Sequence, residues 1–225
     1  MNPTPDHATQ NSPLNKRTQT VLAIETSTAA CSVCLSVGGQ PFHQYQWAPQ
    51  QHANRLLAMI KTVMAQAAVG PDDLDCLAYG QGPGAFTGVR IATGVIQGLG
   101  YGWQKPVVAV NSLQALLAQS HPAHATENVE EKAKESAHRY QGSKPTRLIA
   151  MVDARMQELY WLERAPSALF ASTPKPQMLT PEAAAARLSA LEGETLMGMG
   201  DIDTLYPALA AQCDVFEHAV PRSEE

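Results

Sequence analysis

The feature that most constrains the fold is the glycine-rich stretch GQGPGAFTGVR, residues 80–90, which joins a short apolar run to a segment with helical spacing. A turn of this kind between a strand and a helix leaves backbone N–H groups at the helix N-terminus, where anions are favoured. No Lys-Ser or Lys-Thr pair follows the glycines, and their spacing misses the dinucleotide fingerprint. Two interpretations stay open: an anion-binding turn that includes Gly82 and Gly84, or a tight connection that packs a helix closely on a sheet.

The first half of the chain alternates strand and helix patterns around this stretch. Three strand-like runs come first, with Gly38-Gly39 as a hairpin signal between the second and the third. Residues 50–69 carry apolar side chains at helical spacing, and a second helix is expected over 87–101. A further strand and a short helix capped by Ser112 complete the unit. The order β-β-β-α-β-α-β-α predicts an α/β lobe over residues 20–120, a mixed sheet with helices on it.

The rest of the chain divides into three parts by composition. Residues 1–19 predict a disordered tail, and residues 121–146 form a polar insert with a thin apolar stripe. Residues 147–225 form a second, β-rich unit, with Thr180-Pro181 as a helix start and another helix expected over 204–212. Asp153 and Arg155, two apart on a strand, share one face and can pair across a turn.

Composition and charge exclude several classes of protein. The chain has 16 Lys and Arg against 21 Asp and Glu, a net charge of −5, so it has no whole-molecule basic footprint for nucleic acid. No stretch approaches the roughly 20 apolar residues of a membrane span, and no export signal is convincing, so we expect a cytoplasmic protein. Cys31 and Cys34 lack a second pair or a His partner, which favours small buried residues over a redox or metal pair.

A second candidate for chemistry is the strand end Glu25-Thr26-Ser27. A carboxylate followed by hydroxyls resembles the phosphate-1 hairpin of the actin, sugar kinase and Hsp70 superfamily. The usual acid there is Asp, followed two residues later by Gly. Here Glu25 is longer, and the Cβ of Ser27 blocks close backbone approach. A nucleotide site and a capped strand-to-turn connection both remain open.

Four segments together resemble the TsaB family, also called YeaZ, over about residues 21–217: VLAIETSTAACSVCL, GPGAFTGVRI, PVVAVNSLQAL and MVDARMQELYW. The resemblance implies the actin-like, ribonuclease H-like (ASKHA) two-lobe fold with an incomplete second lobe. It implies a role in making N6-threonylcarbamoyladenosine at position 37 of tRNAs that read ANN codons. In that pathway the paralogue TsaD transfers the threonylcarbamoyl group, and TsaB is understood as a scaffold that binds and activates it.

The resemblance also implies further partners and the absence of a metal or other cofactor. The ATPase TsaE joins the pair with TsaD, and tRNA is met only within the complex. Ser112 and Leu116 stand where TsaD carries the two histidines of its metal site, so neither a metal nor another cofactor is expected. Glu25, Thr26, Ser27, Gly82 and Gly84 then become candidates for a vestigial nucleotide or anion site. The tail and the insert are longer than usual in the family, and the chain stops where the family usually continues with a helix and a strand.

The docking surface for TsaD is expected on the helices over residues 50–69 and 87–101. Gly94, Gly98, Leu56 and Met59 are the candidate contacts, with Arg90 at the rim. Alone, the same surface predicts a two-fold homodimer that competes with the TsaD pair. The alternative is an enzyme, a small ASKHA phosphotransferase or an M22-like metallopeptidase, with its site at Glu25 and the glycine loop. A direct tRNA-binding module is disfavoured by the acidic charge balance.

Overall fold

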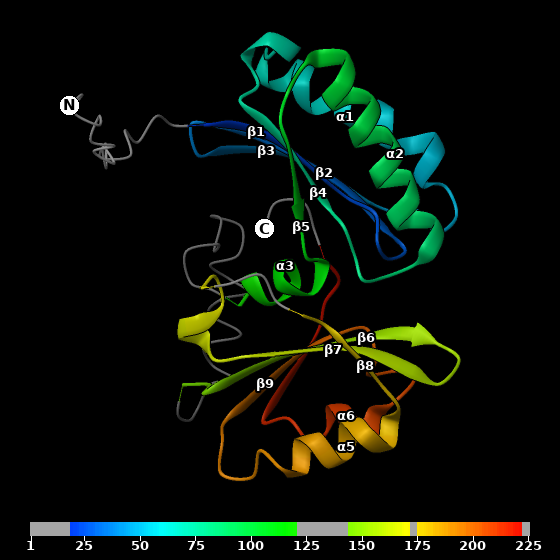
Figure 1. The fold of residues 1–225 in the computed structure, drawn as a ribbon, viewed down its shortest axis with the longest axis vertical. Helices are drawn as coiled ribbons and strands as arrows, with labels where there is room; N and C mark the ends of the chain where they lie inside the picture. The colour runs from blue at the N-terminus through cyan, green and yellow to red at the C-terminus, as the bar shows by residue number, and fades with distance from the viewer. Residues whose placement is uncertain (1–18, 121–143, 172–174, 222–225) are drawn as a thin grey trace, which may run out of the picture.

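The computed structural model describes residues 19–120, 144–171 and 175–221. Residues 1–18 of the predicted tail and residues 121–143 of the predicted insert lie outside the described residues. The described chain forms two lobes, one above the other in Figure 1, and each is built on a five-stranded sheet. The elements of the first lobe lie within residues 20–118 and those of the second within residues 147–218.

The first sheet has the strand order β3-β2-β1-β4-β5. β1 pairs antiparallel with β2, and β2 with β3, so the hairpin predicted between the second and third runs is confirmed. The hairpin turns at Gly38 and Gly39, whose φ angles of 63° and 89° favour glycine. β4 and β5 continue the sheet in parallel from β1. The strands are β1 (Thr20–Glu25), β2 (Ala30–Val37), β3 (Gln40–Trp47), β4 (Cys76–Gly80) and β5 (Val107–Val110).

Two long helices, α1 (His52–Ala67) and α2 (Phe86–Trp103), cover the outer face of this sheet (Figure 1). They correspond to the helices predicted over 50–69 and 87–101. The core beneath them gathers Leu22, Ile24 and Val33 from the strands with Leu56 and Ile96 from the helices, all at most 1% exposed. Burial of such apolar surface is the main stabilising contribution to the lobe.

The second sheet repeats the topology of the first. Its order is β10-β9-β6-β7-β8, with β6–β7 and β7–β8 antiparallel and β6–β9 and β9–β10 parallel. Two lobes with the same five-strand order confirm the predicted actin-like, ribonuclease H-like fold. The strands are β6 (Arg147–Arg155), β7 (Glu158–Arg164), β8 (Gln177–Leu179), β9 (Leu196–Gly200) and β10 (Val215–His218).

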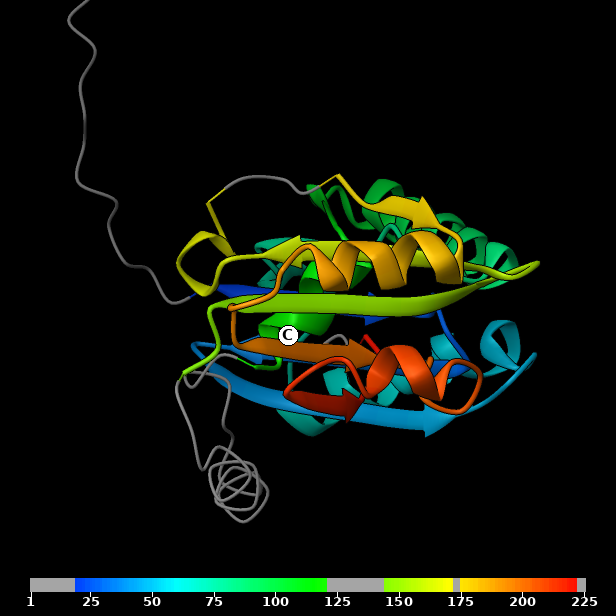
Figure 2. The ribbon, with the colours of Figure 1, turned by 90° about the horizontal axis from the view of Figure 1, so that it is seen from below.

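The helical layer of the second lobe is smaller than that of the first. α5 (Pro181–Ser189) has 9 residues and α6 (Pro207–Ala210) has 4, against 16 and 18 for α1 and α2. Figure 2 shows both short helices on one side of their sheet. Thr180 caps α5 as predicted, since its side chain accepts a hydrogen bond from the Ala183 amide. The helix predicted over 204–212 is shorter because Pro207 lacks an N–H and excludes helical dihedrals from Tyr206 before it.

The helix α3 (Ser112–Ala118) lies between the two lobes (Figure 1). Its Leu113, Leu116 and Leu117 are fully buried and pack against the second sheet. The prediction that Ser112 caps this helix is wrong. Asn111 is the cap, because its Oδ1 accepts hydrogen bonds from the amides of Leu113 at 3.0 Å and Gln114 at 3.1 Å. The Ser112 hydroxyl is therefore available for another contact.

The four cysteines are free thiols, and Cys31, Cys34 and Cys213 are buried. Burial raises the pKa of the Cys31 thiol to about 11, and burial with the nearby Asp214 raises that of Cys213 to about 12. A thiol with so high a pKa stays protonated near neutral pH and is a poor nucleophile. No helix within the described ranges is long and apolar enough to cross a membrane.

We expect Cys31 and Cys213 to resist alkylation in the folded chain. At pH 8 both thiols are protonated and shielded, so iodoacetamide labels them only when the chain opens. Peptide mass spectrometry with and without denaturant checks this. Because an unfolded thiol ionises near pH 8.5 and these do so only near 11 and 12, stability should also fall as pH rises above about 9. Rapid labelling of the native chain at either site would contradict the burial.

Candidate functional site

The carboxyl group of Glu25 joins three elements at the end of β1. Glu25 is 3% exposed, and its Oε1 accepts a hydrogen bond from the Ser27 amide at 2.6 Å. Its Oε2 accepts a hydrogen bond from the Ser112 hydroxyl at 2.8 Å. The same hydroxyl oxygen accepts from the Gly82 amide at 3.1 Å. The end of β1, the glycine loop and the start of α3 are thus held by one continuous set of hydrogen bonds, here called the Glu25 clasp.

The glycine loop lies directly on the residues that follow β1. A Cβ on Gly80 would come within 1.8 Å of Glu25 Oε2, and one on Gly88 within 1.9 Å of the Thr26 carbonyl oxygen. The Thr26 hydroxyl donates to the Gly88 carbonyl at 2.8 Å. The Ala85 amide donates to the Ser27 carbonyl at 2.6 Å. These glycines allow two backbones to approach more closely than any side chain would permit.

The structure therefore brings together all five residues predicted at the candidate anion site. Glu25, Thr26 and Ser27 are at most 3% exposed, Gly82 is buried, and a Cβ on Gly84 would lie 2.3 Å from the Ser27 carbonyl oxygen. The amides of Gly82 and Ala85 and the hydroxyls of Thr26 and Ser112 donate hydrogen bonds to protein acceptors. The Ser27 hydroxyl, by contrast, is buried without a hydrogen-bond partner among the described residues. Chemically, the paired groups order a strand, a loop and a helix.

Ser112 and Leu116, the positions matched to the metal histidines of TsaD, have structural contacts. Ser112 belongs to the Glu25 clasp, and Leu116 is fully buried between α3 and the second sheet. Within residues 19–120, 144–171 and 175–221, no group of three or more His, Cys, Asp or Glu side chains could hold a metal ion. The clasp itself offers one carboxyl group and hydroxyls.

A corresponding turn in the second lobe follows β6. Arg155 donates to Asp153 twice, from its amide to Oδ1 at 3.0 Å and from its guanidinium to Oδ2 at 3.0 Å. The predicted pair thus forms and pins the turn between β6 and β7. The Asp153 amide donates to Asp201 Oδ1 at 2.9 Å. Burial raises the pKa of Asp201, and the neighbouring Asp153 charge adds to that shift.

The predicted docking residues separate into two groups. Leu56 is 0% and Met59 is 7% exposed, and both belong to the core of the first lobe. Their prediction as surface contacts is wrong, because α1 turns these positions toward the sheet. Leu57, the next residue, is 48% exposed on the outer side. The helical period alone does not distinguish the core-facing stripe of α1 from an exposed one.

Gly94, Gly98 and Arg90 of α2 are on the exposed side as predicted. Gly102 extends the row at the same i, i+4 spacing, and a Cβ added to Gly94, Gly98 or Gly102 would meet nothing within 4 Å. Phe86 and Tyr101 flank the row at 67% and 83% exposure, and the Arg90 guanidinium carbon lies 3.6 Å from the Phe86 ring centroid. Sequence reasoning missed these two aromatic residues and Gly102, although the helical spacing from Gly98 could have found them.

We expect the Glu25→Gln substitution to destabilise the chain by about 1–3 kcal/mol. A Gln amide cannot accept with both terminal atoms, so either the Ser27 amide or the Ser112 hydroxyl would face another donor. Ser112→Ala should cost a similar amount, and the double variant should cost less than the sum because both changes remove one shared bond. Urea unfolding measures all three, with Ser189→Ala on the exposed side of α5 as the control. Strict additivity would contradict the clasp.

The family model "TsaD: tRNA N6-adenosine threonylcarbamoyltransferase" matches residues 46–185. The "tRNA threonylcarbamoyladenosine biosynthesis protein TsaB" of Escherichia coli is 34% identical over 176 residues, 77% of this chain and 68% of that protein. The protein of the same description from Haemophilus influenzae is 37% identical over 142 residues, 63% of this chain. That match spans 52% of the Haemophilus protein, about half its length.

A solved structure agrees with these sequence matches. The crystal structure of an uncharacterized protein with similarity to peptidase YeaZ, from Pseudomonas aeruginosa, superposes with a TM-score of 0.69. It is 31% identical to this chain, and the superposition covers 92% of this chain and 87% of the other. The family model, the Escherichia coli relative and the structural neighbour point to the same group of proteins. The chain belongs to the TsaB (YeaZ) family.

Proposed function

We propose that the chain is a non-catalytic accessory subunit that binds and activates TsaD. The reaction is the formation of N6-threonylcarbamoyladenosine at position 37 of tRNAs that read ANN codons. Family membership supports the pathway, since the curated relatives carry threonylcarbamoyladenosine biosynthesis in their names. The subunit has no cofactor of its own in this proposal. It acts in the cytoplasm, TsaE joins through the pair with TsaD, and tRNA is bound only by the complex.

The observation that carries the proposal is the row Gly94, Gly98 and Gly102 on the outer side of α2. A glycine inside a helix costs about 1 kcal/mol relative to Ala, so the row costs about 3 kcal/mol. None of the described residues uses the space, because a Cβ at each position meets no described atom within 4 Å. A helix from another chain can use it, since small residues let two helix backbones approach closely.

The surroundings of the row suit a protein interface. Phe86 and Tyr101 are large exposed aromatic residues, and Arg90 stacks on the Phe86 ring. Aromatic residues and Arg are enriched at the centres of protein interfaces. Leu57 of the neighbouring helix α1 adds an exposed aliphatic side chain. Together these side chains and the glycine row form what we call the outer helical face.

TsaD is the partner that fits this face by symmetry. A model of the TsaD family matches residues 46–185 of this chain, which include both α1 and α2. A paralogue with the same helix pair can form an approximately two-fold interface in which like helices meet. The same geometry allows two copies of this chain to pair when TsaD is absent. The homodimer and the TsaD pair would then compete for one surface.

The hydrogen bonds of the Glu25 clasp support a non-catalytic role. Both carboxyl oxygens of Glu25 accept from protein donors, so neither is directed at a substrate. A general base must reach the proton that it removes, and Glu25 is only 3% exposed. Ser112 and Leu116 supply no imidazole where TsaD has its metal site. A phosphotransferase or a metallopeptidase centred on Glu25 is therefore the less favoured function.

We expect a reconstituted reaction to require this chain. Purified TsaC, TsaD and TsaE with tRNA, threonine, bicarbonate and ATP should form the modified adenosine only when the chain is added, as scored by mass spectrometry of nucleosides. The chain alone should form none. A reaction that proceeds equally well without it would exclude the accessory role. ATP-dependent phosphoryl transfer or peptide cleavage by the chain, lost in Glu25→Gln, would instead support the enzyme alternative.

The glycine row predicts effects of opposite sign on stability and binding. Gly94→Ala and Gly98→Ala should each stabilise the isolated monomer by about 0.5–1 kcal/mol, because the Cβ meets open space and Ala favours a helix. The same substitutions should weaken TsaD binding. Gly94→Trp should weaken it by more than about tenfold, as measured by calorimetry.

Two controls make this test specific. Ala186→Trp places the same bulk on an exposed position of α5 and should leave TsaD affinity unchanged. Gly88→Ala should destabilise the chain, because its Cβ would lie 1.9 Å from the Thr26 carbonyl oxygen. Stability is compared at concentrations where sedimentation shows a monomer. TsaD affinity that survives Gly94→Trp unchanged would place the interface elsewhere.

A further inference from the structure

The turn between β6 and β7 departs from the usual rules of hairpin loops. Arg155 pairs with Glu158, so Met156 and Gln157 form a two-residue loop. The φ angles of Arg155, Met156 and Gln157 are 69°, 52° and 61°, all in the left-handed region. A residue with a Cβ is disfavoured in that region, and three in succession are energetically costly. The turn therefore carries backbone strain.

Another hairpin of the same chain avoids this strain. β2 and β3 are joined by the two-residue loop Gly38-Gly39, which has positive φ at both positions. Two-residue hairpin loops of this kind favour Gly and Asn, because these residues adopt positive φ with little strain. A glycine in the β6–β7 loop would serve the backbone in the same way. The path of the chain therefore does not require the side chains of Met156 and Gln157.

The side chain of Met156 does not offset the strain through contacts of its own. Met156 is 94% exposed, the highest value among the large apolar residues that the structure describes. An apolar side chain stabilises a structure only when another surface covers it. The unbranched thioether of Met adapts its shape to irregular apolar pockets. A socket on another protein would supply the burial that Met156 lacks within the chain.

Asp153 holds the strained turn in one conformation. Its two carboxyl oxygens accept from the amide and from the guanidinium of Arg155, each at 3.0 Å. The Asp153 amide donates to Asp201 Oδ1 at 2.9 Å, which ties the turn to the residue that follows β9. Strained residues persist only where surrounding contacts of this kind determine their conformation. A projection that is already ordered loses little conformational entropy when a partner binds it.

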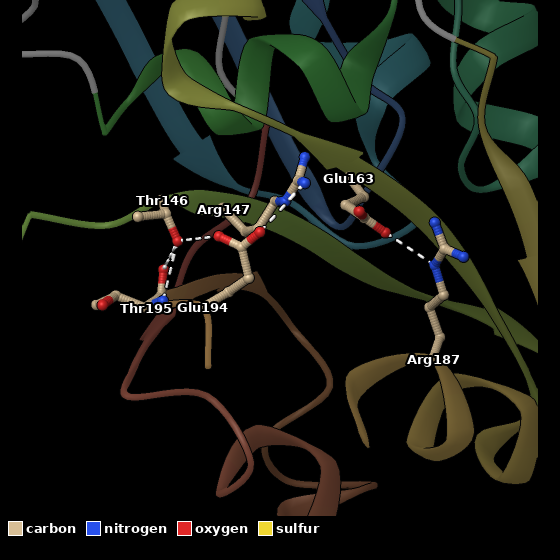
Figure 3. Close-up of polar contacts among 6 residues, drawn as sticks. All are labelled: Thr146, Arg147, Glu163, Arg187, Glu194 and Thr195. Carbon is tan, nitrogen blue, oxygen red and sulfur yellow. Dashed lines mark hydrogen bonds and ion pairs between the residues drawn. The ribbon is translucent and has the colours of Figure 1, made fainter. Parts of the chain in front are cut away.

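Two other ion pairs of the second lobe connect separate elements instead. Arg187 of α5 donates to Glu163 near the far end of β7 at 2.9 Å (Figure 3). Arg147 of β6 donates to Glu194, which precedes β9, at 3.3 Å. These pairs stabilise the packing of one element on another. The pair that holds the turn joins residues only two apart, so it stabilises the conformation of the turn itself.

We propose that Met156 inserts into an apolar socket of the protein that covers the outer helical face. Figure 1 shows the β6–β7 turn on the right of the second lobe, below the end of the first lobe at which α2 begins, and Figure 2 shows the same hairpin projecting from the lobe. Phe86, 67% exposed, stands in the first turn of α2. One partner on this side can therefore contact both lobes, and an apolar tip suits a protein socket rather than a phosphate backbone.

The inference rests on the proposed function, because it takes TsaD as that partner. Contact through α1 and α2 alone would hold only the first lobe. A second contact at Met156 would also fix the second lobe relative to TsaD. The turn is suited to this task because it is rigid and apolar at its tip.

Two substitutions in the turn separate the side chain from the strain. Met156→Ala should weaken TsaD binding by about tenfold or more in calorimetry, because the apolar contact is lost. It should leave the Tm of the isolated chain unchanged, since Met156 is exposed. Gln157→Gly should raise the Tm by about 2–4 °C and leave TsaD affinity unchanged, because it relieves one left-handed residue. Arg187→Ala, near the far end of β7, is the matched control and should leave the affinity unchanged.

Oxidation of methionine reports the contact directly. Hydrogen peroxide should convert Met156 to its sulfoxide readily in the free chain, because the side chain is exposed. The same conversion should be severalfold slower in the complex with TsaD, as measured by peptide mass spectrometry. Met178 on β8, 57% exposed, is the internal control and should react at the same rate in both states.

The outcomes separate this inference from the proposed function. If Gly94→Trp weakens TsaD binding while Met156→Ala does not, and Met156 stays reactive in the complex, the socket contact is wrong and the accessory role stands. Protection of Met156 in the chain alone, with none added by TsaD, would assign the socket to a second copy and would also overturn the proposal. Failure of the unaltered chain to bind TsaD would remove the proposed function and this inference together.

Discussion

The hydrogen bonds of the Glu25 carboxyl group connect parts of the chain that would otherwise meet only through apolar packing. A carboxyl group with 3% exposure is tolerated only when its oxygens find donors, and those donors come from the turn after β1 and from α3. Gly80 must lack a Cβ for the carboxyl group to fit, and Gly82 completes the set through its amide. Because α3 also packs on the second sheet, this polar contact fixes the end of the first sheet relative to the helix that separates the lobes. Because each carboxyl oxygen of Glu25 accepts from a protein donor, a slip of either segment would leave a buried group unpaired, which favours this one arrangement.

Local sequence patterns predicted most of the helices, strands and turns. The helix cap of α3 and the strand order of the second sheet depend on contacts between distant residues, which local patterns do not contain. The hairpin at Gly38-Gly39 and the Thr180 cap depend on a few adjacent residues, and both are present. Asn111 and Ser112 are adjacent and both are suitable caps, so the sequence offered no basis for choosing between them. The Ser112 hydroxyl donates a hydrogen bond to Glu25, 87 residues away in the sequence, and the Asn111 side chain caps α3 instead. The topology of the second sheet was accessible only through the family resemblance, because strand patterns do not specify which strands become neighbours.

The glycines of residues 80–102 also have different structural environments that the sequence alone does not distinguish. In the sequence they form one run of similar spacing, but in space they divide into two groups. Gly80, Gly84 and Gly88 face protein atoms that a Cβ would strike, whereas Gly94, Gly98 and Gly102 face open space. The first group is explained by the fold and the second is not, which is why only the second bears on a partner. Leu56 and Met59 show the opposite case, because they were predicted as interface contacts but are buried in the core of their own lobe. An apolar stripe on a helix usually packs against the core of its own chain.

The two lobes share one topology but depart from local rules in different places. On the first, Gly94, Gly98 and Gly102 lie on the exposed side of α2, where Ala would favour the helix. On the second, Met156 and Gln157 adopt positive φ in a two-residue loop, where Gly or Asn would be less strained. Neither Met nor Gln signals positive φ, so the sequence predicted a turn there but not its conformation. Natural sequences depart from such rules mainly where function requires it, and no contact printed by the described residues' own packing explains either departure. Both lobes thus present a feature that a partner would explain: a row of glycines on the first and a rigid apolar projection on the second.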